Sequence, residues 1–253
     1  MCLIVVAIDL RRDYPLIVAA NRDEFFARPT APAQYWPDFA QVLAGRDLDQ
    51  GGTWMGMTRE GRFAAVTNFR DGGHRVGRKS RGWLVRDFLA GDEEPVNYLA
   101  RVDTEHDAYD GFNLIVGHGH ALAYYSNRNR EVTPLAAGVY GLSNHLLDTP
   151  WPKVERAKDA LRRLRDIPAE DLEGALAQLL ADDARAPDEA LPRTGVSLEW
   201  ERVLSSAFIR TPAYGTRAST LVLGARTGQT VFRETNFGSD GQPIDTRRFV
   251  IEC

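Results

Sequence analysis

Short apolar runs alternate with polar turns over much of the chain, and this pattern predicts antiparallel hairpins. Residues 3–10 and 16–21 are rich in aliphatic side chains, and the polar segment 11–15 separates them. Three further pairs of apolar runs are arranged in the same way: 53–58 with 63–69, 112–116 with 121–125, and 218–225 with 230–235. A last short strand is expected over 249–252. The pattern therefore indicates a protein built largely from β-hairpins.

Apolar residues at three- and four-residue spacings predict three helices in the middle of the chain. The first is expected to have Ser80 as its capping residue and to continue through Leu89. The second covers 151–165, with Pro152 in its first turn, and the third covers 168–180. Residues 182–193 are polar and read as a loop. This order of strands and helices predicts antiparallel sheets whose outer faces are covered by helices.

Composition and charge narrow the class of protein. The chain has 253 residues, of which 43% are hydrophobic and 26% charged, so one soluble domain over residues 1–253 is expected. The net charge of −4 carries no nucleic-acid signature. No apolar run reaches the roughly 18 residues of a transmembrane helix, and no secretory signal precedes the first strand. Two cysteines do not form a disulfide framework, so the cytoplasm is the expected compartment. The oligomeric state stays open.

Cys2 is the residue with the most informative chemistry. Met1 precedes a small side chain, so an aminopeptidase is expected to remove it and leave Cys2 with a free α-amine. The reference pKa of such an amine is about 7.7–8.0 and that of a thiol about 8.5, so both exchange protons near neutral pH. This pairing suits a nucleophile that is activated by its own amine.

A charged cluster, Asn21-Arg22-Asp23-Glu24, closes the second predicted strand. If the first two strands form a hairpin, this cluster returns to the neighbourhood of Cys2. A carboxylate there would bind an N-terminal ammonium, and an arginine would stabilise a thiolate. The alternative is a solvated, charged strand end with no chemical role.

The sequence resembles the NRDE family, also called the transport and Golgi organisation protein 2 family. The resemblance rests on an ordered set of short motifs spanning residues 1–224: Met1-Cys2-Leu3-Ile4, Asn21-Arg22-Asp23-Glu24, Gly51-Gly52-Thr53-Trp54-Met55-Gly56, Thr67-Asn68-Phe69-Arg70, Ser80-Arg81-Gly82, Gly111-Phe112-Asn113-Leu114, Tyr140-Gly141-Leu142-Ser143-Asn144 and Tyr214-Gly215-Thr216-Arg217. Each motif alone is weak, but the ordered set is specific.

That family in turn resembles N-terminal nucleophile hydrolases of the bile-salt hydrolase and penicillin V acylase type. The resemblance implies an α+β fold, a four-layer αββα sandwich with two stacked antiparallel sheets. It also implies cleavage or transfer at the C–N bond of a small-molecule amide. The implied catalytic residues are the nucleophile, its amine partner, two oxyanion asparagines and an arginine near the thiol: Cys2, Asp23, Asn68, Asn144 and Arg217.

Further residues are expected to bind substrate or support the site: Asn21, Arg22, Glu24, Trp54 and His145. The hydrolases have an Arg-Asn-x-Asp order where this chain has Asn-Arg-Asp-Glu, so the division of roles among Arg22, Asp23 and Glu24 stays open. The competing interpretations are that the asparagines hold turns, that Trp54 packs in the core, and that His145 lies on the surface.

Two alternatives complete the sequence-based view. His118 and His120 are two residues apart and would share a strand face, but their flanking glycines indicate a turn and no third ligand cluster is near. No metal and no resident cofactor are therefore expected. The rival function is a non-catalytic haem or lipid binding and trafficking protein on the same scaffold, with haem as its ligand. A degenerate scaffold kept for protein contacts is a third possibility.

Overall fold

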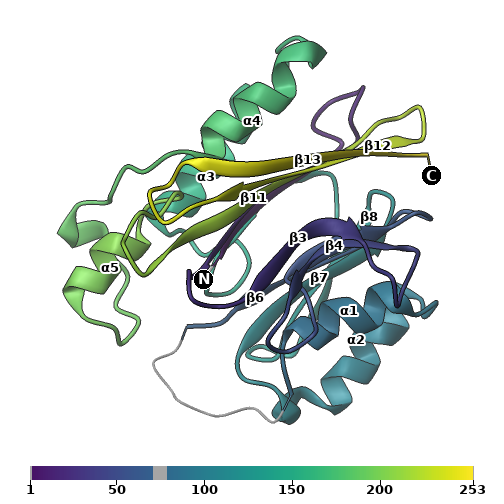
Figure 1. Ribbon diagram of the computed structural model, residues 1–253, viewed down its shortest axis with the longest axis horizontal. Helices are drawn as coiled ribbons and strands as arrows, with labels where there is room; N and C mark the ends of the chain where they lie inside the picture. Colours follow the sequence, from purple (N-terminus) through teal and green to yellow (C-terminus); the bar gives the residue numbers. More distant parts are fainter. Residues whose placement is uncertain (1, 71–78, 253) are drawn as a thin grey trace.

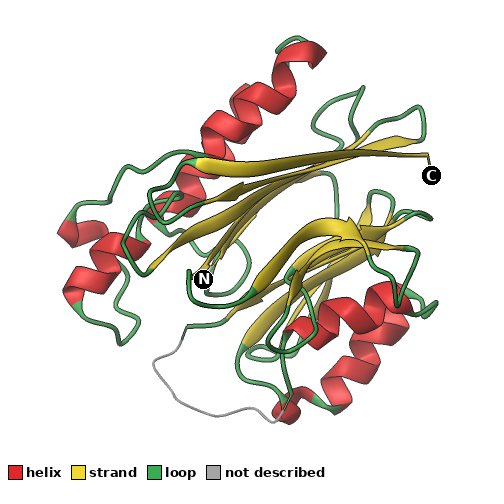
Figure 2. Ribbon diagram, in the orientation of Figure 1, coloured by secondary structure: helices red, strands yellow, loops and turns green. Residues whose placement is uncertain are grey.

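The protein consists of two antiparallel sheets packed face to face between two layers of helices (Figure 1, Figure 2). The computed structural model describes residues 2–70 and 79–252. Helices α3 (Pro152–Arg163) and α4 (Leu172–Leu180) cover one sheet, and α1 (Gly82–Ala90) and α2 (Pro95–Thr104) cover the other. The expected four-layer α+β architecture is confirmed.

The six-stranded sheet has the order β10-β1-β2-β11-β12-β13. Its strands are β1 (Cys2–Ile8), β2 (Leu16–Phe25), β10 (Gly138–Leu142), β11 (Tyr214–Gly224), β12 (Gln229–Phe237) and β13 (Pro243–Glu252). The β1–β2 and β11–β12 hairpins are those that the sequence predicts, and β13 extends the predicted last strand. Pairing of β2 with β11 joins the two ends of the sequence at the centre of this sheet.

The seven-stranded sheet is a meander that follows chain order from β3 to β9. Its strands are β3 (Thr30–Tyr35), β4 (Val42–Asp47), β5 (Met55–Thr58), β6 (Arg62–Asn68), β7 (Phe112–His118), β8 (Ala121–Ser126) and β9 (Val132–Leu135). The β5–β6 and β7–β8 hairpins are both predicted from sequence. Each strand therefore pairs with its neighbour along the chain, and the connection from β6 to β7 contains α1 and α2.

Strand β1 is buried on both faces. Ile4 and Val6 lie in the core between the sheets, while Leu3 and Val5 pack against the α3 and α4 layer. Successive side chains of a strand point to opposite faces, so a strand covered on both sides needs apolar residues at every position. This explains the continuous apolar run at the start of the sequence.

The helices differ from prediction in two respects. Helix α1 begins at Gly82, and the flanking Arg81 makes no side-chain capping bond, so the expected Ser80 cap is wrong. Arg81 itself has helical backbone angles, and the Trp83 main-chain N–H donates to the Ser80 carbonyl at 3.0 Å, so the helical conformation extends back toward Ser80 without a side-chain cap. Helices α2 and α5 (Leu198–Leu204) are not predicted: α5 spans only 7 residues, and the buried positions of α2 are Tyr98, Leu99 and Val102 in an otherwise polar segment. Among the described residues, none of the helices has the length and apolar character to cross a membrane.

Candidate functional site

Strand pairing gathers distant segments at one end of the six-stranded sheet. Cys2 of β1 lies directly opposite Arg22 of β2. Strand β10 ends at Leu142, opposite Ile4, so Asn144 lies two residues further toward the same end as Cys2. Met1, whose removal the sequence predicts, is outside the described residues. The predicted hairpin thus brings the charged cluster back to the cysteine.

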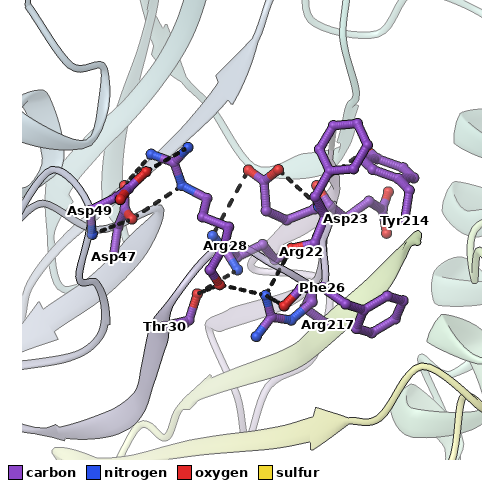
Figure 3. A network of polar contacts seen from close by, with 11 residues as sticks. Arg22, Asp23, Phe26, Arg28, Thr30, Asp47, Asp49, Tyr214 and Arg217 are labelled. Atoms are coloured by element: carbon purple, nitrogen blue, oxygen red, sulfur yellow. Dashed lines mark hydrogen bonds and ion pairs between the residues drawn. The ribbon is translucent and has the colours of Figure 1, made fainter. Parts of the chain in front are cut away.

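Arg22 is almost fully buried and is held by contacts from both sheets (Figure 3). Its guanidinium carbon lies 4.2 Å from the centre of the Trp54 ring. Nη1 donates to the Thr30 hydroxyl at 3.3 Å, and Nη2 lies 3.9 Å from a carboxylate oxygen of Glu24. A cation over an indole face is attracted by the ring quadrupole. Trp54 and Glu24 therefore fix the guanidinium of Arg22, the residue that pairs with Cys2 in the β1–β2 ladder.

Gly45 makes room for this arrangement. A Cβ at position 45 would lie 2.3 Å from a ring atom of Trp54 and 3.2 Å from the Glu234 carboxylate. The buried Glu234 accepts a hydrogen bond from the Ala33 main-chain N–H at 2.7 Å, and burial raises the pKa of its carboxyl. The position of Trp54, and with it that of Arg22, depends on the missing side chain at Gly45.

Asp23 lies beside Arg22 and is fully buried. One carboxylate oxygen accepts a hydrogen bond from the Thr216 hydroxyl at 2.7 Å, and its main-chain carbonyl accepts one from the Tyr214 hydroxyl at 3.2 Å. Burial raises the pKa of Asp23, and the positive charge of Lys153 opposes that rise. Asp23 therefore has a buried counter-charge in the first turn of α3.

Sequence reasoning missed Lys153, although a signal was present. Lys153 is four residues before Ala157 and eight before Leu161, so it lies on the apolar stripe of its own helix. Only 2% of Lys153 is exposed. A lysine at the start of a buried stripe is rarely without a charged partner, and here Asp23 supplies that charge.

Arg217 occupies a β-bulge between Thr216 and Ala218. Its Nη1 donates to the main-chain carbonyls of Phe25, Phe26 and Arg28 at 2.9, 3.3 and 2.8 Å (Figure 3). Burial is the main cause that lowers the pKa of Arg217, and the like charge of Arg22 adds to it. Bulges re-aim side chains, and this one directs a second guanidinium toward the chain that leaves β2.

Asn68 and Asn144, the two expected oxyanion residues, are joined to each other. The side-chain amide of Asn144 donates to the main-chain carbonyl of Asn68 at 2.9 Å. In return, the Arg70 main-chain N–H donates to the Asn144 carbonyl at 2.7 Å. A primary amide has two donor hydrogens. Within the described part of the chain, the bond to Asn68 uses one of those of Asn144, a fully buried residue.

A buried polar network that sequence reasoning missed fixes the segment around Asn144. The side-chain amide of Asn113 donates to the Thr67 hydroxyl and to the His145 carbonyl, both at 3.0 Å. Thr67 in turn donates to the Ser143 carbonyl at 2.7 Å. The available signal was Asn113 itself, a polar residue between Phe112 and Leu114 in an apolar strand. Residues 143–145 are therefore held against the seven-stranded sheet.

The Asn21 side chain lies on the helix-covered face of β2, opposite to the face that carries the Arg22 side chain. Its amide donates to the carbonyls of Leu180 and Ala207, both at 2.8 Å, and its oxygen accepts from the Ser219 hydroxyl at 2.6 Å. All these partners belong to the scaffold on that face. Asn21 supports the strand that carries Arg22 and Asp23.

His145 packs at the edge of the same region. Its ring centre lies 4.7 Å from that of Phe69 and 6.0 Å from that of Trp151, and Nδ1 lies 2.9 Å from the Thr149 hydroxyl. Burial lowers the pKa of His145, so its neutral form is favoured at neutral pH.

A buried ion pair, also unpredicted, borders the site on the α5 side. Arg70 Nη1 lies 3.4 Å from a carboxylate oxygen of Glu201, and the Arg70 guanidinium lies 4.7 Å from the Trp151 ring centre. The other Glu201 oxygen accepts from the Thr194 main-chain N–H and hydroxyl at 2.7 and 2.6 Å. Burial lowers the pKa of Arg70. This pair attaches α5 to the segment that follows Asn68.

Comparison with solved structures defines the class of fold. The chain is similar to a conjugated bile acid hydrolase variant from Clostridium perfringens, with a TM-score of 0.53, 10% identity, and coverage of 98% of this chain and 92% of that one. It is also similar to a Caenorhabditis elegans orthologue of N-acylethanolamine-hydrolyzing acid amidase, with a TM-score of 0.50, 11% identity, and coverage of 88% and 92%. The architecture is that of the N-terminal nucleophile hydrolases.

The chain belongs to the Transport and Golgi organisation 2 family, whose model matches residues 1–239. Its relatives include the Transport and Golgi organization protein 2 homologs of Bos taurus and Homo sapiens. The bovine protein is 40% identical over 95% of both chains, and the human protein is 36% identical over 92% of both. The resemblance inferred from the ordered motifs is confirmed.

Proposed function

We propose that the protein is a cysteine N-terminal nucleophile hydrolase or acyltransferase that acts on the C–N bond of a small-molecule amide. The observation that carries this proposal is the β1–β2 register, in which Cys2 lies opposite Arg22 and one residue from Asp23. A neighbouring guanidinium favours a thiolate, and a neighbouring carboxylate favours an ammonium. The thiolate and the ammonium of an N-terminal Cys2 would thus each have a neighbouring residue of opposite charge, Arg22 and Asp23.

The proposed reaction begins with attack of the Cys2 sulfur on the amide carbonyl carbon while the Cys2 α-amine accepts the thiol proton. The second amide hydrogen of Asn144 stabilises the oxyanion that forms, as preorganised donors do in acyl transfer. The C–N bond then breaks, and the leaving amine takes the proton from the α-ammonium. Water attacks the resulting thioester, which releases the acid; in acyl transfer another nucleophile replaces the water.

Lys153 allows the Cys2 α-amine to lose its proton and act as a base, because it provides a second positive charge for Asp23. If the N-terminal ammonium were the sole counter-charge of the buried Asp23, losing its proton would leave that carboxylate uncompensated, at a large energetic cost. The positive charge of Lys153 acts on Asp23 independently of the ammonium. The amine can therefore cycle between its neutral and charged forms during the reaction.

The names of the structural neighbours support an amide as substrate, since one is an acid amidase and the other hydrolyses a conjugated bile acid. The acyl group and the leaving amine are left open by this proposal.

Turnover of a panel of N-acyl amides tests the proposal. Hydrolysis is expected to be lost in Cys2→Ala and to persist in Cys253→Ala, which removes the only other thiol of the sequence. A Cys2→Ala variant that hydrolyses a verified substrate at the wild-type rate would overturn it.

A further inference from the structure

A cavity of about 170 Å³ lies between the two sheets, at the end of the β1–β2 ladder remote from Cys2. Four hairpin turns surround it: β1–β2, β5–β6, β7–β8 and β11–β12. In Figure 1 the purple β1–β2 turn and the yellow-green β11–β12 turn lie at the right of the view. Both sheets therefore contribute to the cavity, and it is separate from the candidate active site.

The wall of this cavity is apolar. Leu16 and Val222 line it from the six-stranded sheet, and Met57 and Phe63 line it from the seven-stranded sheet. All four side chains are buried. An apolar cavity of roughly 150 Å³ stays dry and binds a molecule of the size of benzene. The volume here thus admits one aromatic ring or a short aliphatic chain.

Apart from the buried Thr230 of β12, the polar side chains that line the cavity lie at its mouth. Glu60, His118 and His120 are exposed residues of the surrounding turns. His118 Nε2 lies 2.5 Å from the Glu60 main-chain carbonyl, so it acts as the donor and leaves Nδ1 as an acceptor in the neutral ring. These residues offer acceptors to a hydroxyl group.

The described residues that line the cavity include no lysine or arginine that could pair with an anionic ligand. Arg226, in the nearby β11–β12 turn, donates to the Arg12 carbonyl at 2.9 Å and lies 3.9 Å from the Asp9 carboxylate. The described residues also contain no group of three or more His, Cys, Asp and Glu side chains arranged to hold a metal ion. The mouth therefore suits an uncharged organic molecule.

We propose that this cavity is a binding site for a small uncharged molecule, consisting of one aromatic ring or a short aliphatic chain, with at most one hydroxyl group at the mouth. The proposal does not depend on the reaction proposed for Cys2. It assigns His118 and His120, which lie apart from the candidate active site, to a second site.

Methionine methyl NMR tests the proposal in the unmodified protein. The sequence has three methionines, of which Met57 lines the cavity, whereas Met55 lies beside Trp54 and Arg22. Titration with benzyl alcohol is expected to shift the Met57 methyl resonance saturably and to leave the Met55 resonance in place. Benzoate, which differs in its charge, is expected to bind more weakly. The Met57→Leu variant assigns the resonance.

A matched pair of variants adds a second test. Ala225 lines the cavity and is half-buried, so Ala225→Trp places a ring in its mouth. Thr227 is exposed in the same turn and does not line the cavity, so Thr227→Trp is the control. The first variant is expected to abolish the saturable shift and the second to keep it. Absence of a saturable Met57 shift in the wild-type protein, or equal binding by a folded Ala225→Trp variant, would overturn the proposal.

Discussion

The side-chain amide of Asn144 donates a hydrogen bond at 2.9 Å to the main-chain carbonyl of Asn68, and this bond connects the two sheets. Asn68 ends β6 of the seven-stranded sheet, whereas Asn144 follows β10 of the six-stranded sheet. The Arg70 N–H returns a bond to Asn144 at 2.7 Å. The position of the candidate oxyanion donor relative to Cys2 is therefore set by the way the sheets are joined.

Replacing Asn144 tests this connection. Asn144→Ala removes a buried hydrogen bond and is expected to lower the free energy of unfolding by about 1–3 kcal/mol. It is also expected to slow acylation of Cys2 by about 10²–10³-fold, as loss of one oxyanion donor does. Urea unfolding and single-turnover acylation measure the two effects.

Asn127→Ala is the control for that variant. Asn127 is also a buried asparagine; its side-chain oxygen accepts from the Phe112 main-chain N–H at 2.9 Å, and its side-chain nitrogen donates to the His106 and Asp110 carbonyls. The Asn127→Ala variant is expected to lose about as much free energy of unfolding as Asn144→Ala, with no change in the rate of Cys2 acylation. An equal fall in acylation for both variants would mean that Asn144 acts only through stability.

Gly45→Ala tests whether Trp54 positions Arg22. The new Cβ would lie 2.3 Å from the Trp54 ring, so the indole must move away from the Arg22 guanidinium that it contacts at 4.2 Å. Alkylation of Cys2 by iodoacetamide at neutral pH is expected to slow, because the guanidinium that favours the thiolate is displaced.

Gly174→Ala is the matched control, because nothing lies within 4 Å of a Cβ built at that position of α4. It is expected to stabilise the protein by about 0.5–1 kcal/mol and to leave alkylation unchanged. Unchanged alkylation in a folded Gly45→Ala protein would show that Trp54 does not control the reactivity of Cys2.

Glu234→Gln gives a prediction for the pH dependence of stability. Burial raises the folded-state pKa of Glu234 above its ordinary value of 4.5. Below that ordinary value the carboxyl is neutral in the folded and the unfolded state, so it does not make the free energy of unfolding depend on pH. As the pH rises above it, the unfolded state loses the proton more readily, and the native state of the wild type becomes relatively less stable.

The stability of Glu234→Gln relative to the wild type is therefore expected to increase from pH 4 toward pH 8, as measured by urea unfolding. The variant keeps an oxygen that can accept from the Ala33 N–H. A difference that is constant with pH, or that favours the wild type as pH rises, would contradict the assigned shift.

Arg217→Ala tests the role of the β11 bulge. The variant removes hydrogen bonds to the carbonyls of Phe25, Phe26 and Arg28, and a bond from a charged donor contributes about 1.5–3 kcal/mol. Faster amide hydrogen exchange is expected at Phe26 and Arg28, whose N–H groups bond to Ala213 and Phe25. The exposed Arg226→Ala serves as the control. Unaltered exchange at these amides would show that Arg217 does not hold this segment.

Local pattern was sufficient to predict four hairpins, β1–β2, β5–β6, β7–β8 and β11–β12, and the layered architecture. The β1–β2 turn is a polar interruption between two apolar runs, and the return of residues 21–24 to the neighbourhood of Cys2 follows once that turn is recognised; the register that pairs Cys2 with Arg22 is set by the closure of Ile8 on Leu16. By contrast, β3 contains a proline and polar residues, and β10 contains two glycines, so neither has the composition typical of a strand. Their place in a sheet is decided by tertiary pairing.

The interactions missed at the site are those between residues far apart in sequence. Lys153 meets Asp23 only after α3 packs on the six-stranded sheet, and Asn113 meets the segment after Asn144 only after the two sheets stack. Periodicity assigns a residue to a face but does not identify the partner across a layer. The haem or lipid-binding alternative stays a prediction. Titration of the protein with haem, followed by absorbance, would test its haem-binding form.

Intact mass spectrometry of the purified protein after reaction with an activated amide tests the central claim most directly. The account predicts a chain without Met1 that carries one acyl group, mapped to Cys2 and released by hydroxylamine as a thioester. A chain that retains Met1, or an acyl group found on Cys253 in place of Cys2, would contradict it.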